Sequence, residues 1–189
     1  MAVETPMKRQ IVVSALGIAL ATAIGATLVN ADDWTERFGR TRHDVAPTAN
    51  PQYRSLCGEC HMAYQPGLLP AASWQRVMDG LADHFGDDAE LAPADAAAIR
   101  AHLTANAADR AAGQRSAGFG PAGGPGAAPL RITETRYFLG KHHEVPVRLA
   151  RDNPDVRSFA NCAACHQRAE AGSYNEDEIR IPGVGAWDD

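Results

Sequence analysis

Apolar residues recur at helical spacing in two stretches of the first half of the chain. In residues 74–85 they form one stripe, made of Trp74, Val77, Met78, Leu81 and Phe85. A helix turns once in about 3.6 residues, so this spacing places the stripe on one face, with Ser73 as a candidate N-cap. Pro93 suits the first turn of a second helix. The apolar face of that helix consists of Ala96, Ile99, Leu103 and Ala107.

The rest of the pattern also favours helices. A short helix is expected over residues 57–62, followed by a loop over 64–70, and residues 133–143 are a further helical candidate. Asn153 followed by Pro154 predicts the start of a helix that carries residues 162–166. Possible strands are limited to short stretches near 131–133 and 179–181. The sequence therefore predicts a mainly α fold.

Residues 111–129 differ from their surroundings because they are rich in Gly, Ala and Pro and offer almost nothing to bury. Such a composition is typical of a flexible linker. We therefore predict a first domain over residues 32–110, the linker over 111–129, and a smaller second domain over 130–189.

The N-terminus predicts export. Lys8 and Arg9 precede an uncharged, mostly apolar stretch over residues 11–29, and Val29 and Ala31 stand at positions −3 and −1 of a cleavage site. This is the pattern of a secretory signal peptide over residues 1–31 and places the mature protein in the periplasm. The alternative is an uncleaved N-terminal anchor, because the apolar stretch could just span a bilayer. Its many small residues favour the signal peptide.

Net charge narrows the possible partners. Lys and Arg number 18 against 23 Asp and Glu, which gives a formal charge of −5. A nucleic-acid partner is not expected, because such proteins present a strongly basic surface.

The four cysteines form two pairs, each followed at once by histidine. The two motifs are Cys57-Gly-Glu-Cys60-His61 and Cys162-Ala-Ala-Cys165-His166. On a helix, positions i, i+3 and i+4 share a face. Two cysteine sulfurs can then form thioethers to the vinyl groups of one haem, while the histidine coordinates its iron. The motifs predict two covalently bound haem c groups.

Other uses of paired cysteines fit less well. A four-thiolate zinc site normally has its two pairs much closer in sequence, and zinc does not explain a histidine after each pair. A thioredoxin-like dithiol would need alternating strands and helices, which the pattern lacks.

The residue in the sixth coordination position decides whether a haem can bind an external ligand. In residues 130–189 there is no methionine, and besides His166 the histidines are His142 and His143. His142 is preferred, because Phe138 and Leu139 would form an apolar wall beside it on a helix, but His143 stays an alternative.

The first haem has more candidates for this position. His84 is preferred because it lies near the predicted end of the helix over 74–85, where a side chain can approach iron without removing a turn from the core. Met78 is more typical of core packing. His102, His43 and an open site stay alternatives, whereas Met62 adjoins His61 and cannot readily reach the opposite haem face.

With these residues placed, the chain resembles the small dihaem cytochrome c family. Members of that family work beside a membrane cytochrome b and an oxygen-binding monohaem cytochrome c called sphaeroides haem protein. The similar segments are residues 57–70, 81–89, 131–138, 141–144, 162–166 and 179–182.

The resemblance implies two histidines on each iron, His61 with His84 and His166 with His142, although the two distal histidines could be exchanged. It also implies a class I cytochrome c fold for the first unit, with a packing role for His102. The expected partners are the membrane cytochrome b, through transient contact, as electron donor and the oxygen-binding cytochrome c as acceptor.

These observations predict a periplasmic electron-transfer protein and not an enzyme. The alternative is a small haem enzyme, of peroxidase or nitrogen-oxide reductase type, or a gas sensor. Each of these would need one haem with an open sixth position.

Overall fold

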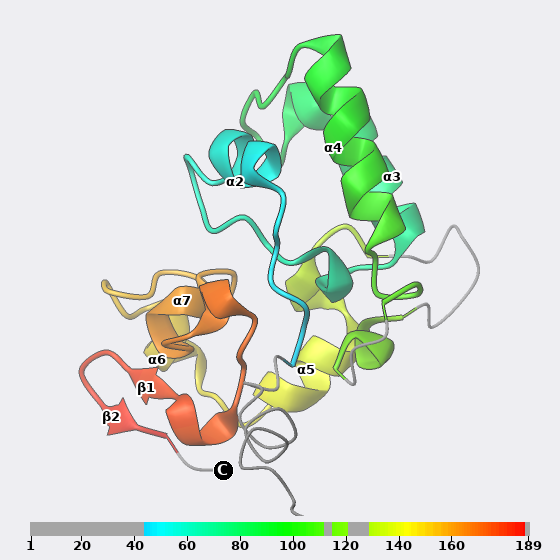
Figure 1. Ribbon diagram of the computed structural model, residues 1–189. Coiled ribbons are helices and arrows are strands. Elements are labelled where there is room, and N and C mark those ends of the chain that lie inside the picture. Colours follow the sequence, from blue (N-terminus) through cyan, green and yellow to red (C-terminus); the bar gives the residue numbers. More distant parts are fainter. Residues whose placement is uncertain (1–43, 112–114, 121–128, 188–189) are drawn as a thin grey trace, which may run out of the picture. The chain divides into compact units, whose positions relative to one another are not determined.

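The computed structural model describes residues 44–111, 115–120 and 129–187 of the chain. Its α-helices are α2 Pro51–Cys57, α3 Ala71–Asp79, α4 Pro93–Ala105, α5 Arg136–His142, α6 Val147–Ala150 and α7 Cys162–Cys165 (Figure 1). Short 3-10 turns include η1 Pro66–Leu68, η2 Leu81–Asp83, η3 Ser116–Phe119, η5 Ile132–Glu134, η6 Ala169–Ala171 and η7 Glu176–Glu178. The strands β1 Arg180–Ile181 and β2 Gly185–Ala186 pair antiparallel. The prediction of a mainly α fold is confirmed.

The predicted signal peptide, residues 1–31, lies outside the described residues. Within the described part of the chain, no helix combines the length and the apolar character needed to cross a bilayer.

Helix α3 differs at both ends from the predicted helix over 74–85. It begins at Ala71, after Pro70, and Ser73 is a fully buried residue inside the helix and not its N-cap. It ends at Gly80, whose N–H donates to the Val77 carbonyl over 3.2 Å. Glycine is a poor helix former, so the chain leaves the helix there, and Leu81 starts the separate turn η2.

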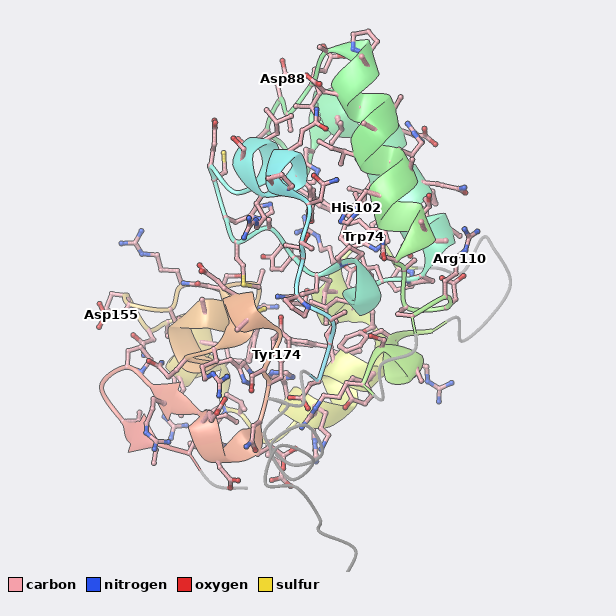
Figure 2. The ribbon with its side chains drawn as sticks, in the orientation of Figure 1. Trp74, Asp88, His102, Arg110, Asp155 and Tyr174 are labelled. Carbon is pink, nitrogen blue, oxygen red and sulfur yellow. The ribbon has the colours of Figure 1, made fainter. Side chains whose placement is uncertain are left out.

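Helix α4 confirms the second predicted helix, with Pro93 in its first turn. It lies beside α3 in the half of the molecule that carries the first motif (Figure 1). The buried cluster between them includes Tyr53, Leu69, Trp74, Met78, Ile99, Leu103 and Ala107. The Trp74 indole, labelled in Figure 2, also donates a hydrogen bond to the Pro66 carbonyl over 2.7 Å. The buried indole N–H is therefore satisfied.

The predicted helix over 57–62 is wrong, because α2 reaches only to Cys57. Asn50 caps the start of α2, and its side chain accepts the Tyr53 N–H. At the other end, the Gly58 N–H bonds to the Arg54 carbonyl over 3.1 Å. A Cβ at position 58 would overlap that carbonyl oxygen, so only glycine fits this close approach.

The second half of the chain follows the prediction in part. Helix α5 lies inside the predicted stretch 133–143 but starts at Arg136, with Thr135 as its N-cap. The helix expected from Asn153 is wrong: the Asn153 side chain accepts the Asp155 N–H in a local turn. Helix α7 therefore starts only at Cys162. Strand β1 lies within 179–181. The possible strand near 131–133 is wrong, because Arg131 lies in a bend and the next two residues belong to η5.

Six described residues of the predicted linker, 115–120, are folded. They include η3, in which Phe119 is 8% exposed and packs on the Tyr137 ring with centroids 4.8 Å apart. Arg115 forms an ion pair with Asp44 over 3.0 Å. Phe119 is the one large apolar side chain in the Gly- and Ala-rich segment, and it attaches this part to the second core cluster. The division into two domains stays a prediction.

Candidate haem sites

The first motif occupies the end of α2 and the turn after it. Cys57 is the last residue of the helix and is half-buried, whereas Cys60 and His61 are exposed. Burial raises the pKa of the Cys57 thiol. Both thiols are free of disulfides, so they are available to form thioethers.

His84 faces His61 in this region. The two imidazole rings have centroids 6.2 Å apart and planes inclined by 29°. His61 Nδ1 lies 2.8 Å from the Met62 carbonyl oxygen. A proton on Nδ1 is therefore held by that carbonyl, which leaves the Nε2 lone pair for a metal.

The sequence predicted His84 near the end of a helix. In the structure it follows η2 and lies in a tight turn. Its N–H donates to the Asp87 carbonyl over 2.7 Å, and the Ala89 N–H closes the turn onto Leu81 over 2.9 Å. Phe85 has φ 60° and Gly86 has φ 108°, so the chain reverses at these two residues. Burial, with smaller contributions from His61 and Arg131, lowers the pKa of His84, which favours the neutral imidazole that binds metals.

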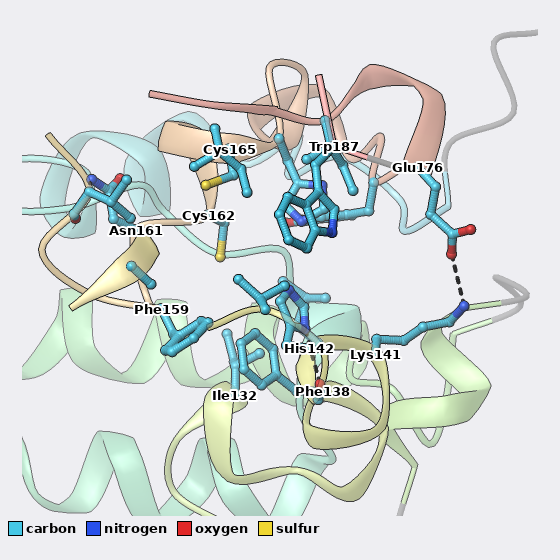
Figure 3. Close-up of a pocket in the computed structure, with 18 of the residues that line it drawn as sticks. Ile132, Phe138, Lys141, His142, Phe159, Asn161, Cys162, Cys165, Glu176 and Trp187 are labelled. Atoms are coloured by element: carbon cyan, nitrogen blue, oxygen red, sulfur yellow. Dashed lines mark hydrogen bonds and ion pairs between the residues drawn. The ribbon is translucent and has the colours of Figure 1, made fainter. Parts of the chain in front are cut away.

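The second motif lies on α7, where Cys162 and Cys165 occupy one helical turn and His166 follows. The two cysteines were expected to share one face of a helix, and both of them line the same cavity. This cavity has a volume of about 110 Å³ and is partly open to solvent. Figure 3 shows the two cysteines on one side of it and His142 with Phe138 on the other. Burial raises the pKa of Cys162 to about 11.

His142 and His166 face each other in this cavity, with ring centroids 6.1 Å apart and planes at 72°. The His142 ring stacks on Phe138 with a centroid distance of 3.8 Å, and its Nδ1 lies 3.0 Å from the Phe138 carbonyl. The edge of Phe159 also approaches it. Burial, followed by His142 and Arg115, lowers the pKa of His166 to about 4, so this imidazole is neutral at physiological pH.

The structure places the other candidate ligands elsewhere. Met78 is buried in the core between α3 and α4. His102 packs on the Tyr53 ring, with centroids 5.8 Å apart, and lies 3.5 Å from the Thr48 hydroxyl. His143 is exposed beside Glu144, 3.5 Å away. His43 lies outside the described residues.

The rings of each histidine pair lie as far apart as an iron between them would require. Metal–imidazole bonds are about 2.0–2.1 Å long, so an ion held by two opposed ring nitrogens separates the ring centroids by roughly 6.3 Å. The observed separations are 6.2 and 6.1 Å. Rotation of a ring about the axis through the metal changes the angle between the planes but not this separation, so both pairs are compatible with a haem.

The family model for dihaem cytochrome c matches residues 53–174. The chain belongs to the dihaem cytochrome c family. It carries two covalently bound haem c groups, and membership of this family implies electron transfer.

Solved dihaem cytochromes c resemble the chain closely. One from Shewanella baltica is 41% identical, with a TM-score of 0.62, and the match covers 74% of this chain and 98% of that one. Another, from Rhodobacter sphaeroides, is 40% identical, with a TM-score of 0.60, and the match covers 69% of this chain and all of the other. A search of curated proteins found no match.

Several residues around the haem sites of this cytochrome were not predicted from the sequence. In the second cavity they include Arg115, Phe159, Tyr174 and Trp187. Lys141 and Glu176, joined by an ion pair of 2.8 Å, also line it (Figure 3). No periodic pattern marks them, because they come from separate turns that meet only in the folded chain. Arg115 even lies in the segment predicted to be a linker.

Proposed function

We propose that this cytochrome is a periplasmic electron relay in which both irons are held by two histidines. His61 and His84 hold the first iron, and His166 and His142 hold the second. The observation that carries this proposal is the separation of the ring centroids in each pair, 6.2 and 6.1 Å, which is the size that an iron between two ring nitrogens would need. When bound, each haem supplies a one-electron couple between ferric and ferrous iron.

Two strong ligands on each iron suit a carrier and not an enzyme. Such an iron has no position for oxygen, peroxide or a nitrogen oxide. The protein therefore has to hold the ligands in place and leave access for partners. His142 is held in place by contacts with Phe138 and Phe159.

The proposed partners follow from the resemblance described above. A membrane cytochrome b would donate the electron in a transient contact, and an oxygen-binding monohaem cytochrome c would accept it. Export by the signal peptide over residues 1–31 would bring the protein to the periplasm, where it could meet these two partners.

An absorption spectrum of the dithionite-reduced protein before and after addition of carbon monoxide tests this function. The expected result is no shift of the Soret band, because neither iron has a free position. Binding of carbon monoxide to one haem per chain would contradict the relay at that haem and would favour the enzyme or gas sensor.

A further inference from the structure

The cavity at the second motif has mostly apolar walls but also carries charge. Among the described residues that line it, the Lys, Arg, Asp and Glu side chains are those of Arg115, Lys141 and Glu176. Charged groups are costly beside an apolar cavity unless an opposite charge pairs with them. Two cations against one anion therefore indicate a ligand that brings negative charge into this cavity.

Arg115 is held in the wall of the cavity by an ion pair. Its side chain is 25% exposed, and its Nε lies 3.0 Å from Oδ1 of Asp44. Oδ2 of Asp44 accepts the Tyr174 N–H over 2.7 Å, so the carboxylate is itself held in place. A guanidinium has five N–H donors, and the bond through Nε leaves those of the two terminal nitrogens for other acceptors.

Arg115 keeps its charge and lies near Lys141. Burial would lower the pKa of the guanidinium, but the hydrogen bond and the charge of Asp44, with smaller contributions from Tyr137, raise it above the usual value. Tyr137 lies on α5, and Lys141 follows it by four residues, on the same face of that helix. The hydrogen bond and the charge of Glu176 raise the pKa of Lys141, and repulsion from Arg115 opposes them. Both cations therefore approach the same end of the cavity.

The two cysteines determine which edge of a haem faces this end. Thioethers join Cys162 and Cys165 to the vinyl groups, and the two propionates stand on the edge of the macrocycle away from the vinyl groups. In Figure 3 the two cysteines lie on one side of the His142 ring, and the ion pair of Lys141 with Glu176 lies on the other. The propionates therefore point toward the end of the cavity at which the cations lie.

We propose that Arg115 and Lys141 bind the two propionates of the second haem. Arg115 binds one carboxylate through its terminal nitrogens, in charge-assisted hydrogen bonds, and the 48% exposed Lys141 binds the other at the rim. This inference goes beyond the relay function, because it depends on attachment of the haem at Cys162 and Cys165 and not on where its electrons go. The same cations compensate for the burial of the carboxylates.

A cation at this position also affects the reduction potential of the second haem. Ferric iron carries one positive charge more than ferrous iron, so a nearby guanidinium disfavours the ferric state and raises the potential. The charge of Arg115 reaches the site, because it contributes, after burial and His142, to the lowered pKa of His166. Loss of Arg115 is therefore expected to lower the potential of this haem and to leave that of the first haem unchanged.

Resonance Raman spectroscopy and a redox titration of the haem-bearing protein test this assignment. Arg115→Gln is expected to shift the bending band of the haem propionates and to lower one of the two reduction potentials. Arg115→Lys keeps the charge but loses the planar fork, so the band should shift while the potential falls less. Lys141→Gln should give smaller changes, because solvent screens the half-exposed ammonium group. Nuclear Overhauser contacts with Phe159 assign the affected haem, and unchanged absorption bands show that each variant is folded.

Arg100→Gln is the matched control. Arg100 also forms an ion pair with an aspartate, Asp79, over 2.6 Å, but it lines neither this cavity nor the pocket beside His84. The propionate band and both potentials should stay as in wild type. An unshifted band in Arg115→Gln would overturn the assignment even if a potential falls, because the charge would then act without contact. Equal shifts in Arg100→Gln would also overturn it, by showing an unspecific effect of charge.

Discussion

Gln65 donates a hydrogen bond from Nε2 to the Ala169 carbonyl over 2.7 Å, although the two residues are 104 positions apart. Its Oε1 accepts a second bond, from Tyr174. A buried amide whose two polar groups are both satisfied stabilises one arrangement of its partners and penalises others. Gln65 therefore joins the chain around the first motif to the chain around the second.

Gln65→Leu is expected to lower the free energy of unfolding by about 2–4 kcal/mol, because it leaves the Ala169 carbonyl and the Tyr174 hydroxyl buried without this partner. Chemical denaturation of the haem-bearing protein measures the loss. The control is Gln52→Leu: Gln52 also donates from Nε2 over 2.7 Å, to Asp95, but at the exposed surface. It should cost no more than about 0.5 kcal/mol. Similar losses in both variants would show that the buried bonds add nothing.

His84→Ala should open the first haem. The reduced variant is expected to bind carbon monoxide at one haem per chain, because the opposite imidazole is gone while His61 stays in place. His102→Ala is the control and should leave the carbon monoxide spectrum unchanged, since His102 packs on Tyr53. If the gas binds after loss of His102 and not of His84, the proposed ligand set is wrong.

His142→Ala should open the second haem in the same way, whereas His143→Ala should not. The two histidines are neighbours, but His142 lies against Phe138 in the cavity and His143 lies at the surface beside Glu144. Absorption titration with carbon monoxide distinguishes them. If only His143→Ala changes the spectrum, His143 and not His142 is the ligand of the second iron.

His102 should make stability depend on pH. Burial lowers its pKa from the usual value of 6.5, so below that value the unfolded chain binds more protons than the folded one. Its contribution to stability is therefore present above pH 6.5 and is lost as the pH falls through the lowered pKa. Urea denaturation between pH 7 and 5 should show a steeper loss in wild type than in His102→Phe. Parallel curves would mean that His102 does not titrate differently on folding.

Much of the haem chemistry could be predicted from local sequence. Each cysteine pair with its following histidine is a contiguous pattern, and His142 could be preferred over His143 because Phe138 precedes it by one helical turn. The apolar face of the second predicted helix was correct for Ile99 and Leu103, which are both buried in α4, whereas Ala107 lies beyond the last residue of that helix, Ala105. These predictions depend only on spacing within one element.

The bounds of the short elements could not be predicted so well. Gly80 ends α3 and Gly58 ends α2, so His84 and His61 both lie in turns that helical spacing did not foresee. At Gly58 the stop depends on a close approach to the Arg54 carbonyl, and at His84 on a reversal through Phe85 and Gly86. Competition between a helix and a turn of similar local free energy is decided by such contacts.

The sequence by itself determined that the protein binds two haems covalently, because the thioether chemistry needs only the two motifs. It also determined the mainly α character, through periodicity. Only the tertiary structure decided which histidines oppose each other, and that Tyr64 and Gln65 of one half contact Ala160 and Ala169 of the other. The physical reason is that these relations join residues about a hundred positions apart, whose meeting depends on the packing of the whole core and leaves no periodic trace in the chain.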